Sequence, residues 1–509
     1  MQFYLTASSL LLMLFALTLR KYILPDMAQK TTTIVVGGGL AGLSAAIEAA
    51  TTNAAMHVIL VDKENNIGGN SAKATSGING MTETGDSWEA FEHDTLESGG
   101  GLSNESLVHK LVHQSVNALQ WLQQQDTTLD LSLVSQCGGH TFPRTHRCPP
   151  KPNGSPVPVG WRLVQALRQR FEQLDNASVR TQSRVTQLRT DPSTGVITGV
   201  ELNNKEMLSA NAVILTSGGF GGQTQPLDQP DGTQTLLSQY APNLLNIATT
   251  NGPWANGDGI RLGVAIGAAT KDMDQIQIHP TGFVDPNNPK AGTKFLAPEA
   301  LRAYGGVLLN TDGHRFTNEL GRRDAVTQSI LEQSNNVVWL VLTDTMIDQF
   351  GRSTAEFYAK RGFFVKCSGI DHLAEHLGVS VTLLNDEFAR YDLHVDQKRT
   401  DTTISSVPDA FGKTIFPNPL AGQDIHYWVA QITPCIHYTM GGLAINTDAA
   451  VLSENTKQPI PGLYAAGEVT SGVHGKNRLA GNSLLECVVY GRTAGQNAAK
   501  YCSTSISEK

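Results

Sequence analysis

Two adjacent arginines stand out in the segment NELGRRDAV, where Arg322 and Arg323 lie between Glu319 and Asp324. Paired guanidinium groups can clamp a carboxylate or a phosphate, but such a cluster is more often a solvated surface of a helix. The chain has 509 residues and a formal net charge of −8, which argues against an electrostatic hold on nucleic acid. An anionic small substrate would instead need a local cationic pocket.

The clearest chemical motif is GxGxxG, which spans Gly37-Gly38-Gly39-Leu40-Ala41-Gly42. It follows a strand predicted from Thr33 to Val36 and opens a helix rich in small residues, so its backbone can approach a pyrophosphate at the helix N-terminus. About twenty residues after Gly42, Asp62 ends a second predicted strand and is placed to accept a ribose hydroxyl. The motif therefore predicts a dinucleotide site in a Rossmann-type α/β domain rather than a merely tight turn.

Three further glycine-rich blocks follow, with the sequences IGGNSAKATSGING, LTSGGFGG and PGLYAAGEVTSGVHGKNRLAGNS. Together with GGGLAG they resemble the FAD-dependent flavoproteins of the fumarate reductase and succinate dehydrogenase superfamily. The likeness is closest to the soluble yeast-type fumarate reductases and to the flavin portion of flavocytochrome c. It extends from Thr31 to about Ala499 and implies that the cofactor is FAD.

The resemblance implies that the glycine turn and Asp62 hold the ADP half of FAD. The segment after the second strand would pass near the flavin, and Glu468 would meet the ribityl or diphosphate region. Where membrane-bound relatives attach FAD to a histidine, this chain has Asn70, Ser71 and Ala72, so we expect non-covalent FAD. The implied cofactor residues are Gly37, Gly39, Leu40, Ala41, Gly42, Asp62, Lys63, Asn70, Ser71, Gly77, Ile78, Asn79, Gly218, Asp258, Glu468, Asn482, Ser483 and Leu484.

The resemblance also implies a site for fumarate, which would be reduced to succinate. Reduction of a carbon–carbon double bond by hydride from flavin N5 requires that negative charge on the neighbouring carbon be stabilised and then protonated. By resemblance, His279, His437 and Arg478 bind the substrate carboxylates. Arg323 matches the arginine that both holds fumarate and donates the proton, whereas Arg322 is expected to be an ordinary surface charge.

The segment PEALR supplies a candidate proton relay to Arg323. Pro298 suits the first position of a helix, which would place Glu299 and Arg302 on one helix face, and the resemblance assigns these two residues to reprotonating Arg323. Some relatives have threonine where this chain has Pro298, so one hydrogen bond to a substrate carboxylate is lost or replaced by water. Each of these residues alone would favour a structural role; together, in the family order, they favour catalysis.

Two other functions remain open at the level of sequence. One is reduction of another activated alkene, such as urocanate or a 3-ketosteroid, and the other is a flavin subunit that only transfers electrons. Two histidines beside Arg323 and Arg478 favour a small dicarboxylate, whereas a steroid site would need an apolar pocket containing tyrosine. The electron donor could be NADH, reduced free FAD or FMN, or a protein, because only one convincing dinucleotide motif is present.

The pattern of elements predicts a discontinuous FAD-binding α/β domain with an inserted α+β capping domain. We expect the first part of the FAD domain at residues 31–272, the cap at 273–436 and the second part at 437–505, with cap closure bringing Arg323 to the flavin. Helices are predicted from Leu102 to about Gln125 and from Trp161 to about Leu174, with an antiparallel meander after them.

The first nineteen residues carry no charge and are followed by Arg20 and Lys21, as in a signal peptide or a short anchor. We therefore expect residues 1–30 to target the mitochondrion or the endoplasmic reticulum, and Met27 could start a cytosolic form. The six cysteines lie far apart with no metal-type spacing, so they are predicted to be buried thiols, and no metal site is expected.

Overall fold

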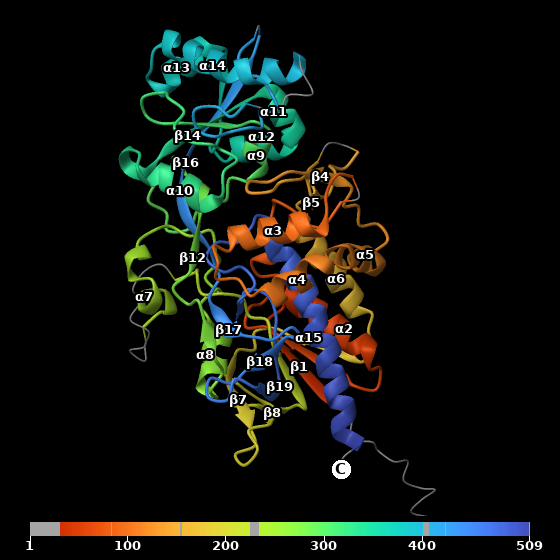
Figure 1. Cartoon of the computed structure of the whole chain (residues 1–509). Coiled ribbons are helices and arrows are strands. Elements are labelled where there is room, and N and C mark those ends of the chain that lie inside the picture. The colour runs from red at the N-terminus through yellow and green to blue at the C-terminus, as the bar shows by residue number, and fades with distance from the viewer. Residues whose placement is uncertain are drawn as a thin grey trace, which may run out of the picture.

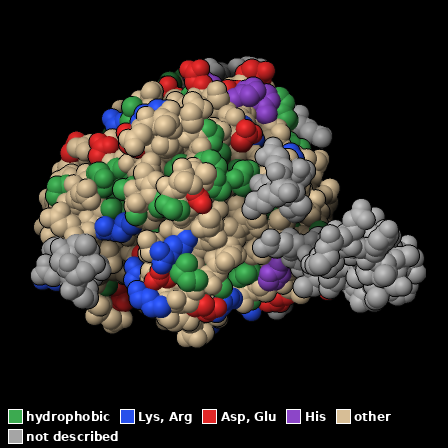
Figure 2. Space-filling model, turned by 90° about the horizontal axis from the view of Figure 1, so that it is seen from below, with side chains coloured by type: hydrophobic (Ala, Val, Ile, Leu, Met, Phe, Trp, Pro, Cys, Tyr) green, Lys and Arg blue, Asp and Glu red, His purple; other side chains and the backbone are tan. Residues whose placement is uncertain are grey.

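The computed structural model describes residues 31–82, 84–152, 155–223, 234–400, 407–422 and 424–507. The predicted targeting segment, residues 1–30, lies outside these described residues. Within the described ranges, every helix is too short or too polar to cross a membrane. On the face shown in Figure 2, basic and acidic side chains lie in small separate groups and neither sign forms a continuous patch.

The lower part of the molecule in Figure 1 is built on a six-stranded sheet with the order β18-β19-β10-β1-β2-β6. All neighbouring strands are parallel except β18, which pairs antiparallel with β19. Because β19 comes from the C-terminal part of the chain, the sheet confirms the predicted discontinuous Rossmann-type fold. The strands are β1 (Thr32–Val36), β2 (His57–Val61), β6 (Ala177–Arg180), β10 (Ala212–Leu215), β18 (Ala450–Leu452) and β19 (Pro459–Ala465).

Two long helices from opposite ends of the chain, α2 (Leu40–Thr52) and α15 (Asn482–Ser507), pack tightly together. A Cβ atom at Gly495 would lie 2.3 Å from the carbonyl oxygen of Ala45, so the close approach requires glycine there. The other helices of the lower part around α2 and α15 are α3 (Trp88–Ser98), α4 (Glu105–His113), α5 (Ser115–Gln125) and α6 (Val159–Glu172).

The helix predicted from Leu102 to Gln125 is in fact two helices, α4 and α5. The Oδ1 atom of Asn104 caps α4 by accepting a hydrogen bond from the Leu107 amide at 3.2 Å, and Gln114, at φ −92° and ψ 0°, separates α4 from α5. The predicted meander is confirmed as the antiparallel sheet β7-β8-β9. The small sheets use β7 (Val185–Thr190), β8 (Ile197–Leu202), β9 (Met207–Ser209), β3 (Ile78–Asn79), β4 (Leu133–Ser135), β5 (Thr145–Arg147), β11 (Thr270–Lys271), β17 (Gly442–Ala444) and β20 (Thr470–Ser471).

The upper part of the molecule has its own sheet, its own helices and a separate hydrophobic core (Figure 1). Its sheet has the order β12-β16-β14-β13, with β15 also paired to β16, and the long strands β12 and β16 run down toward the lower part. Its strands are β12 (Ile276–Phe283), β13 (Val307–Leu309), β14 (Val338–Thr343), β15 (Val365–Ser368) and β16 (His426–Thr439).

The helices of the upper part are α9 (Ala300–Ala303), α10 (Arg323–Leu331), α11 (Asp344–Phe350), α12 (Arg352–Lys360), α13 (Ile370–Leu377) and α14 (Val381–Thr400). They agree with the predicted inserted α+β unit, while the boundaries at 272/273 and 436/437 stay a prediction. Two short helices, α7 (Leu236–Tyr240) and α8 (Asp258–Ala265), lie beside the lower part. All six cysteines are free and buried, as predicted.

Candidate active site

A cavity of about 1280 Å³ lies between the two parts of the molecule. It exceeds the roughly 300–1,000 Å³ of an ordinary small-molecule pocket, so it has room for a dinucleotide together with a small substrate. Three of the predicted substrate or catalytic residues line it, namely Arg323, His437 and Arg478. The predicted cofactor residues that line it are Gly37, Gly39, Leu40, Ala41, Asp62, Lys63, Asn70, Ser71, Gly77, Gly218, Asp258, Glu468, Ser483 and Leu484.

The glycine turn forms a cradle that side chains would fill. Gly37 has φ +108°, and a Cβ atom there would lie 2.6 Å from the carbonyl oxygen of Thr216. A Cβ atom at Gly42 would lie 1.9 Å from the carbonyl oxygen of Gly37, so α2 can approach the sheet only with glycine there. The first turn of α2 carries no acidic side chain, and its Leu40 amide donates to the Ser71 hydroxyl at 3.3 Å, so the helix N-terminus together with Ser71 faces the cavity where a diphosphate would lie. These features fit FAD.

Asp62 holds the turn from the second strand. Its Oδ2 atom accepts a hydrogen bond from the Gly38 amide at 2.7 Å and its Oδ1 atom accepts one from the Glu64 amide at 2.8 Å. Burial raises the pKa of this carboxyl group, against the lowering effect of these two hydrogen bonds. Nearby, Lys63 and Asp258 form an ion pair at 2.8 Å, so these two predicted cofactor residues bond to each other at the cavity wall.

Four predicted cofactor residues, Gly42, Ile78, Asn79 and Asn482, are not part of the cavity lining. Asn79 is fully buried, and its Nδ2 atom donates to Oδ1 of Asn482 and to the carbonyl oxygen of Ala480, each at 2.7 Å. The two asparagines therefore hold the start of α15 from behind the cavity wall.

The two predicted histidines meet because their strands pair. His279 lies opposite Cys435 in the β12–β16 register, so His437, two residues further along β16, projects beside it. The ring centroids are 5.0 Å apart. The Thr250 hydroxyl is 2.7 Å from Nδ1 of His437, and Nδ1 of His279 accepts a hydrogen bond from the Thr281 amide at 3.1 Å.

Both histidines are held neutral. Burial and the positive charge of Arg323 lower the pKa of each imidazole well below its ordinary value. Because Nδ1 of His279 accepts a hydrogen bond, its Nε2 atom carries the proton, and within the described residues that atom has no hydrogen-bond partner. This Nε2 atom faces Oε2 of Glu299 at 3.9 Å, and His279 lies behind the residues that line the cavity.

Arg323, the first residue of α10, is tied to one carboxylate. Its Nε and Nη2 atoms each lie 2.8 Å from Oε2 of Glu299, and its Nη1 atom donates to Oε1 of Gln277 at 2.9 Å. The other oxygen of Glu299 accepts from the Gly138 amide at 2.7 Å. Arg323 is only 4% exposed, so its position is set by these contacts.

The helix of PEALR differs from its prediction. It begins at Ala300 rather than Pro298, and Glu299 occupies the N-cap position with its side chain turned to Arg323 and Gly138 instead of capping the helix. Arg302 lies 3.8 Å from Glu299, an ion pair longer than a hydrogen bond, and Arg323, Glu299 and Arg302 are all buried. Glu299 itself has helical backbone angles, φ −58° and ψ −29°, and the helix ends at Ala303, two residues before Gly305 with φ +109°.

Electrostatic effects on Glu299 oppose each other. Burial disfavours its charged form, but the positive charges of Arg323 and Arg302 and the hydrogen bonds to Glu299 outweigh burial and lower its pKa to about 2. Burial also lowers the pKa of Arg302 below its ordinary value.

Arg478, in the loop before α15, is a buried cation that pairs with no acidic side chain among the described residues. Its guanidinium stacks on the Tyr438 ring at 4.5 Å, its Nη1 atom donates to the Leu479 carbonyl oxygen at 3.3 Å, and its Nε atom has no hydrogen-bond partner in the described part of the chain. Burial, followed by the charge of Arg323, lowers its pKa to about 10. A buried arginine in this state is stabilised by an anionic ligand.

Gln277 and Thr250 belong to the site and were missed from the sequence. Besides accepting from Arg323, Gln277 donates through Nε2 to the carbonyl oxygen of Arg478 at 2.7 Å, so one amide joins the two arginines. Gln277 lies two residues before His279 and thus on the same face of β12, a signal that could have marked it. Nothing in the sequence around Thr250 indicated its contact with His437.

The expectation for Arg322 agrees with the structure. It is 38% exposed and pairs with Glu97 at 3.1 Å and with Asp324 at 3.3 Å, outside the cavity lining. The site itself contains three buried guanidinium groups, on Arg323, Arg302 and Arg478, against the ionised Glu299. With two neutral imidazoles beside them, this arrangement can bind a small dianion and pass a proton through a buried chain.

Comparisons with known proteins place the chain in a family. Residues 32–484 match the family described as FAD binding domain. Fumarate reductase 1 of Saccharomyces cerevisiae is 39% identical over 92% of this chain and 98% of its own length. The fumarate reductase of Schizosaccharomyces pombe is 38% identical over 93% of this chain and 90% of its own.

Among solved structures, the open conformation of a flavocytochrome c3 fumarate reductase is similar, with a TM-score of 0.69 and 31% identity. The alignment covers 96% of this chain and 81% of that one. The cofactor of the chain is FAD. The chain therefore belongs to the FAD binding domain family and is a homologue of the yeast fumarate reductases, which confirms the resemblance drawn from its motifs.

Proposed function

We propose that this protein is an FAD-dependent fumarate reductase that forms succinate. The observation that carries the proposal is the buried guanidinium of Arg478, which has no acidic partner within the described residues and shares the FAD cavity with Arg323. A dianion such as fumarate supplies the missing charge on binding. The yeast relatives named as fumarate reductases support this substrate.

In this proposal the polar end of the cavity binds and orients the substrate. Arg478 and Arg323 bind its carboxylates as cations, and the unpartnered Nε2–H of His279 and the ring of His437 add neutral hydrogen-bonding groups. FAD, when bound, supplies the hydride. The arginine charges favour the negative charge that develops on the substrate carbon next to the carbon receiving the hydride.

Arg323 donates the proton in this scheme. A guanidinium is a poor acid in water, but a carbanion-like substrate is basic enough to take its proton. The ionised Glu299 takes a proton from Arg302, 3.8 Å away, and passes it to the neutral Arg323, 2.8 Å away; Arg302 regains its proton from solvent. Pro298 lines the cavity without a hydroxyl, so water takes the place of the threonine contact of some relatives.

Several finer features belong to the same proposal. FAD binds without a covalent link, because Asn70 and Ser71 stand where the attaching histidine of other relatives would lie. The inserted unit, residues 273–436, closes over the substrate. The donor is NADH, reduced free flavin or a protein, and residues 1–30 direct the chain to the mitochondrion or the endoplasmic reticulum. A reductase of urocanate or of a steroid, or an electron-transfer subunit, fits the paired arginines less well.

The test compares two adjacent arginines. Purified FAD-loaded protein is given reduced viologen, and oxidation of the viologen is followed after fumarate is added. We expect Arg323→Ala to abolish turnover while FAD stays bound, and Arg322→Ala to leave turnover close to wild type. Absence of turnover in the wild type would refute the proposed function, and unchanged turnover in Arg323→Ala would refute the proton-donor role. Urocanate and a 3-ketosteroid serve as alternative substrates in the same assay.

A further inference from the structure

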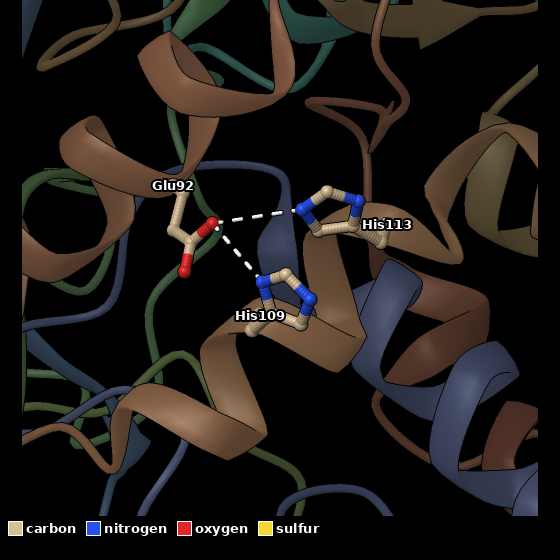
Figure 3. Close-up of side chains that lie close together, drawn as sticks. All are labelled: Glu92, His109 and His113. Atoms are coloured by element: carbon tan, nitrogen blue, oxygen red, sulfur yellow. Dashed lines mark hydrogen bonds and ion pairs between the residues drawn. The ribbon is translucent and has the colours of Figure 1, made fainter.

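Three metal-ligating side chains meet on the surface of the FAD domain, outside the active-site cavity. His109 and His113 lie one turn apart on α4, and Glu92 reaches them from α3 (Figure 3). Oε2 of Glu92 is 3.3 Å from Nδ1 of His109 and 3.6 Å from Nε2 of His113. All three ligand atoms lie within 4.8 Å of one another. Two imidazoles and one carboxylate thus point at a common centre.

These distances fit a tetrahedral ion. Bonds of about 2.0–2.1 Å from zinc to nitrogen and about 2.0–2.2 Å from zinc to oxygen place neighbouring ligand atoms about 3.3–3.5 Å apart. The two separations from Glu92 are 3.3 and 3.6 Å, close to this spacing, and the two histidine nitrogens lie within 4.8 Å of each other, so an ion would draw the imidazoles together around it. Histidines at positions i and i+4 of a helix share one face, which is the spacing used by helical zinc sites.

The local structure holds the ligands in place. The Trp88 ring stacks on His113 with centroids 5.2 Å apart and planes 21° apart, which restricts the His113 imidazole. Ser87 caps α3 and Asn104 caps α4, so both helices begin at defined positions. The side chains of His109, His113 and Glu92 are 61%, 36% and 24% exposed, which leaves the centre open to solvent and to a water ligand.

A second pair of histidines has the same helical spacing but lacks a third ligand, so it serves as a comparison for the cluster. His372 and His376 have the same spacing on α13, but the Nδ1 atom of His372 accepts a hydrogen bond from the Ser368 amide at 3.2 Å. Among the residues that the structure describes, the only group of three or more His, Cys, Asp or Glu ligands is Glu92, His109 and His113. The spacing alone therefore does not create the site; the carboxylate from α3 does.

We propose that Glu92, His109 and His113 bind a zinc ion, with water as the fourth ligand, and so link α3 to α4. Two nitrogen ligands and one carboxylate at tetrahedral spacing suit Zn²⁺, whereas Mg²⁺ and Ca²⁺ prefer shells of oxygen. Fixing α3 to α4 would also affect the loop that carries Arg478. Ser98, at the end of α3, donates a hydrogen bond to the carbonyl oxygen of the neighbouring Asn477 at 2.9 Å. Zinc binding would stabilise this part of the fold.

The test uses the full-length FAD-loaded protein without a histidine tag. Equilibrium dialysis against Zn²⁺ should give one bound ion per chain, and His109→Ala/His113→Ala should lose it. Glu92→Gln should weaken binding at least about tenfold, since even partners outside the metal shell contribute 10–100-fold. Thermal unfolding should shift upward with Zn²⁺ in the wild type but not in the double variant. Co²⁺ in place of Zn²⁺ should show the absorption of a tetrahedral site.

His372→Ala/His376→Ala is the matched control and should bind zinc as the wild type does. Fumarate turnover and flavin content, measured without added metal, should be unchanged in all variants, which shows that they fold. The proposal is wrong if the wild type fails to bind Zn²⁺, or if His109→Ala/His113→Ala binds it equally well. It is also wrong if the α13 control loses the ion, or if Mg²⁺ competes on equal terms.

Discussion

Replacing Glu299 by glutamine tests the buried charge chain most sharply, because the change keeps the shape and removes the charge. One oxygen of Glu299 accepts from the Gly138 amide, and the other from two nitrogens of Arg323. A glutamine has only one oxygen, so its NH₂ group must face either the Gly138 amide or the Arg323 guanidinium. In either orientation a buried donor loses its acceptor, and the positive charge of Arg323 loses its neutralising partner.

The size of the effect follows from the pKa of Glu299. Its pKa lies at about 2 in the folded protein against an ordinary value of 4.5, a difference that corresponds to about 3 kcal/mol of stability. Because the folded-state pKa is depressed, this stabilisation is fully present above about pH 4.5 and is lost as the pH falls toward 2. Breaking a buried ion pair costs about 3–5 kcal/mol, so we expect Glu299→Gln to lower the free energy of unfolding by that amount near neutral pH.

Two measurements separate the structural role of Glu299 from its role in the relay. Denaturant unfolding at a fixed excess of FAD reports the stability loss, with Glu97→Gln as the control because Glu97 makes an exposed pair with Arg322 worth under about 1 kcal/mol. Single-turnover oxidation of the reduced protein by fumarate should slow about 10²–10⁴-fold, the usual contribution of proton transfer. A stability loss below about 1 kcal/mol would refute the charge-pair reasoning, and unchanged oxidation would make Glu299 purely structural.

Three further changes address the substrate, a buried acid and the cofactor. Arg478→Met should raise the KM for fumarate about 30-fold or more, since a buried charged contact contributes about 2–5 kcal/mol, while flavin content stays unchanged in the purified protein. Burial raises the pKa of Glu468 to about 7, so the free energy of unfolding falls as the pH rises from about 4.5 through 7. The urea midpoint of the apo protein should therefore fall over this pH range, and it should fall less in Glu468→Gln than in the wild type. Gly42→Ala would place a Cβ atom 1.9 Å from the Gly37 carbonyl oxygen, so this variant should purify with little flavin per chain, as absorbance would show.

The Rossmann-type fold could be predicted because its signals are local. The glycine turn, the buried strands and the small residues of α2 are contiguous in the sequence, and the parallel sheet follows from them. Histidines on two different predicted segments could be placed together only by resemblance. The structure supplies the physical reason, which is the antiparallel pairing of β12 with β16.

The details that escaped prediction depend on contacts between distant segments. The side chain of Glu299 binds Arg323 and Gly138, which are remote in sequence, so its contacts could not be read from PEALR alone. The hydrogen bonds that join Gln277 to Arg323 and to Arg478 also connect segments that are far apart in the sequence. No metal site was expected from the sequence, because the proposed ligand set of His109 and His113 needs Glu92 from another helix, which local spacing does not indicate.

The most direct test of the proposed reaction is a single turnover without oxygen. The FAD-loaded protein is first reduced chemically, excess reductant is removed, and fumarate is added while the absorbance of oxidised flavin and the amount of succinate are followed. Fumarate reductase activity predicts full return of oxidised flavin with one succinate formed per flavin. A flavin that stays reduced in fumarate, yet reoxidises when air is admitted, would contradict it.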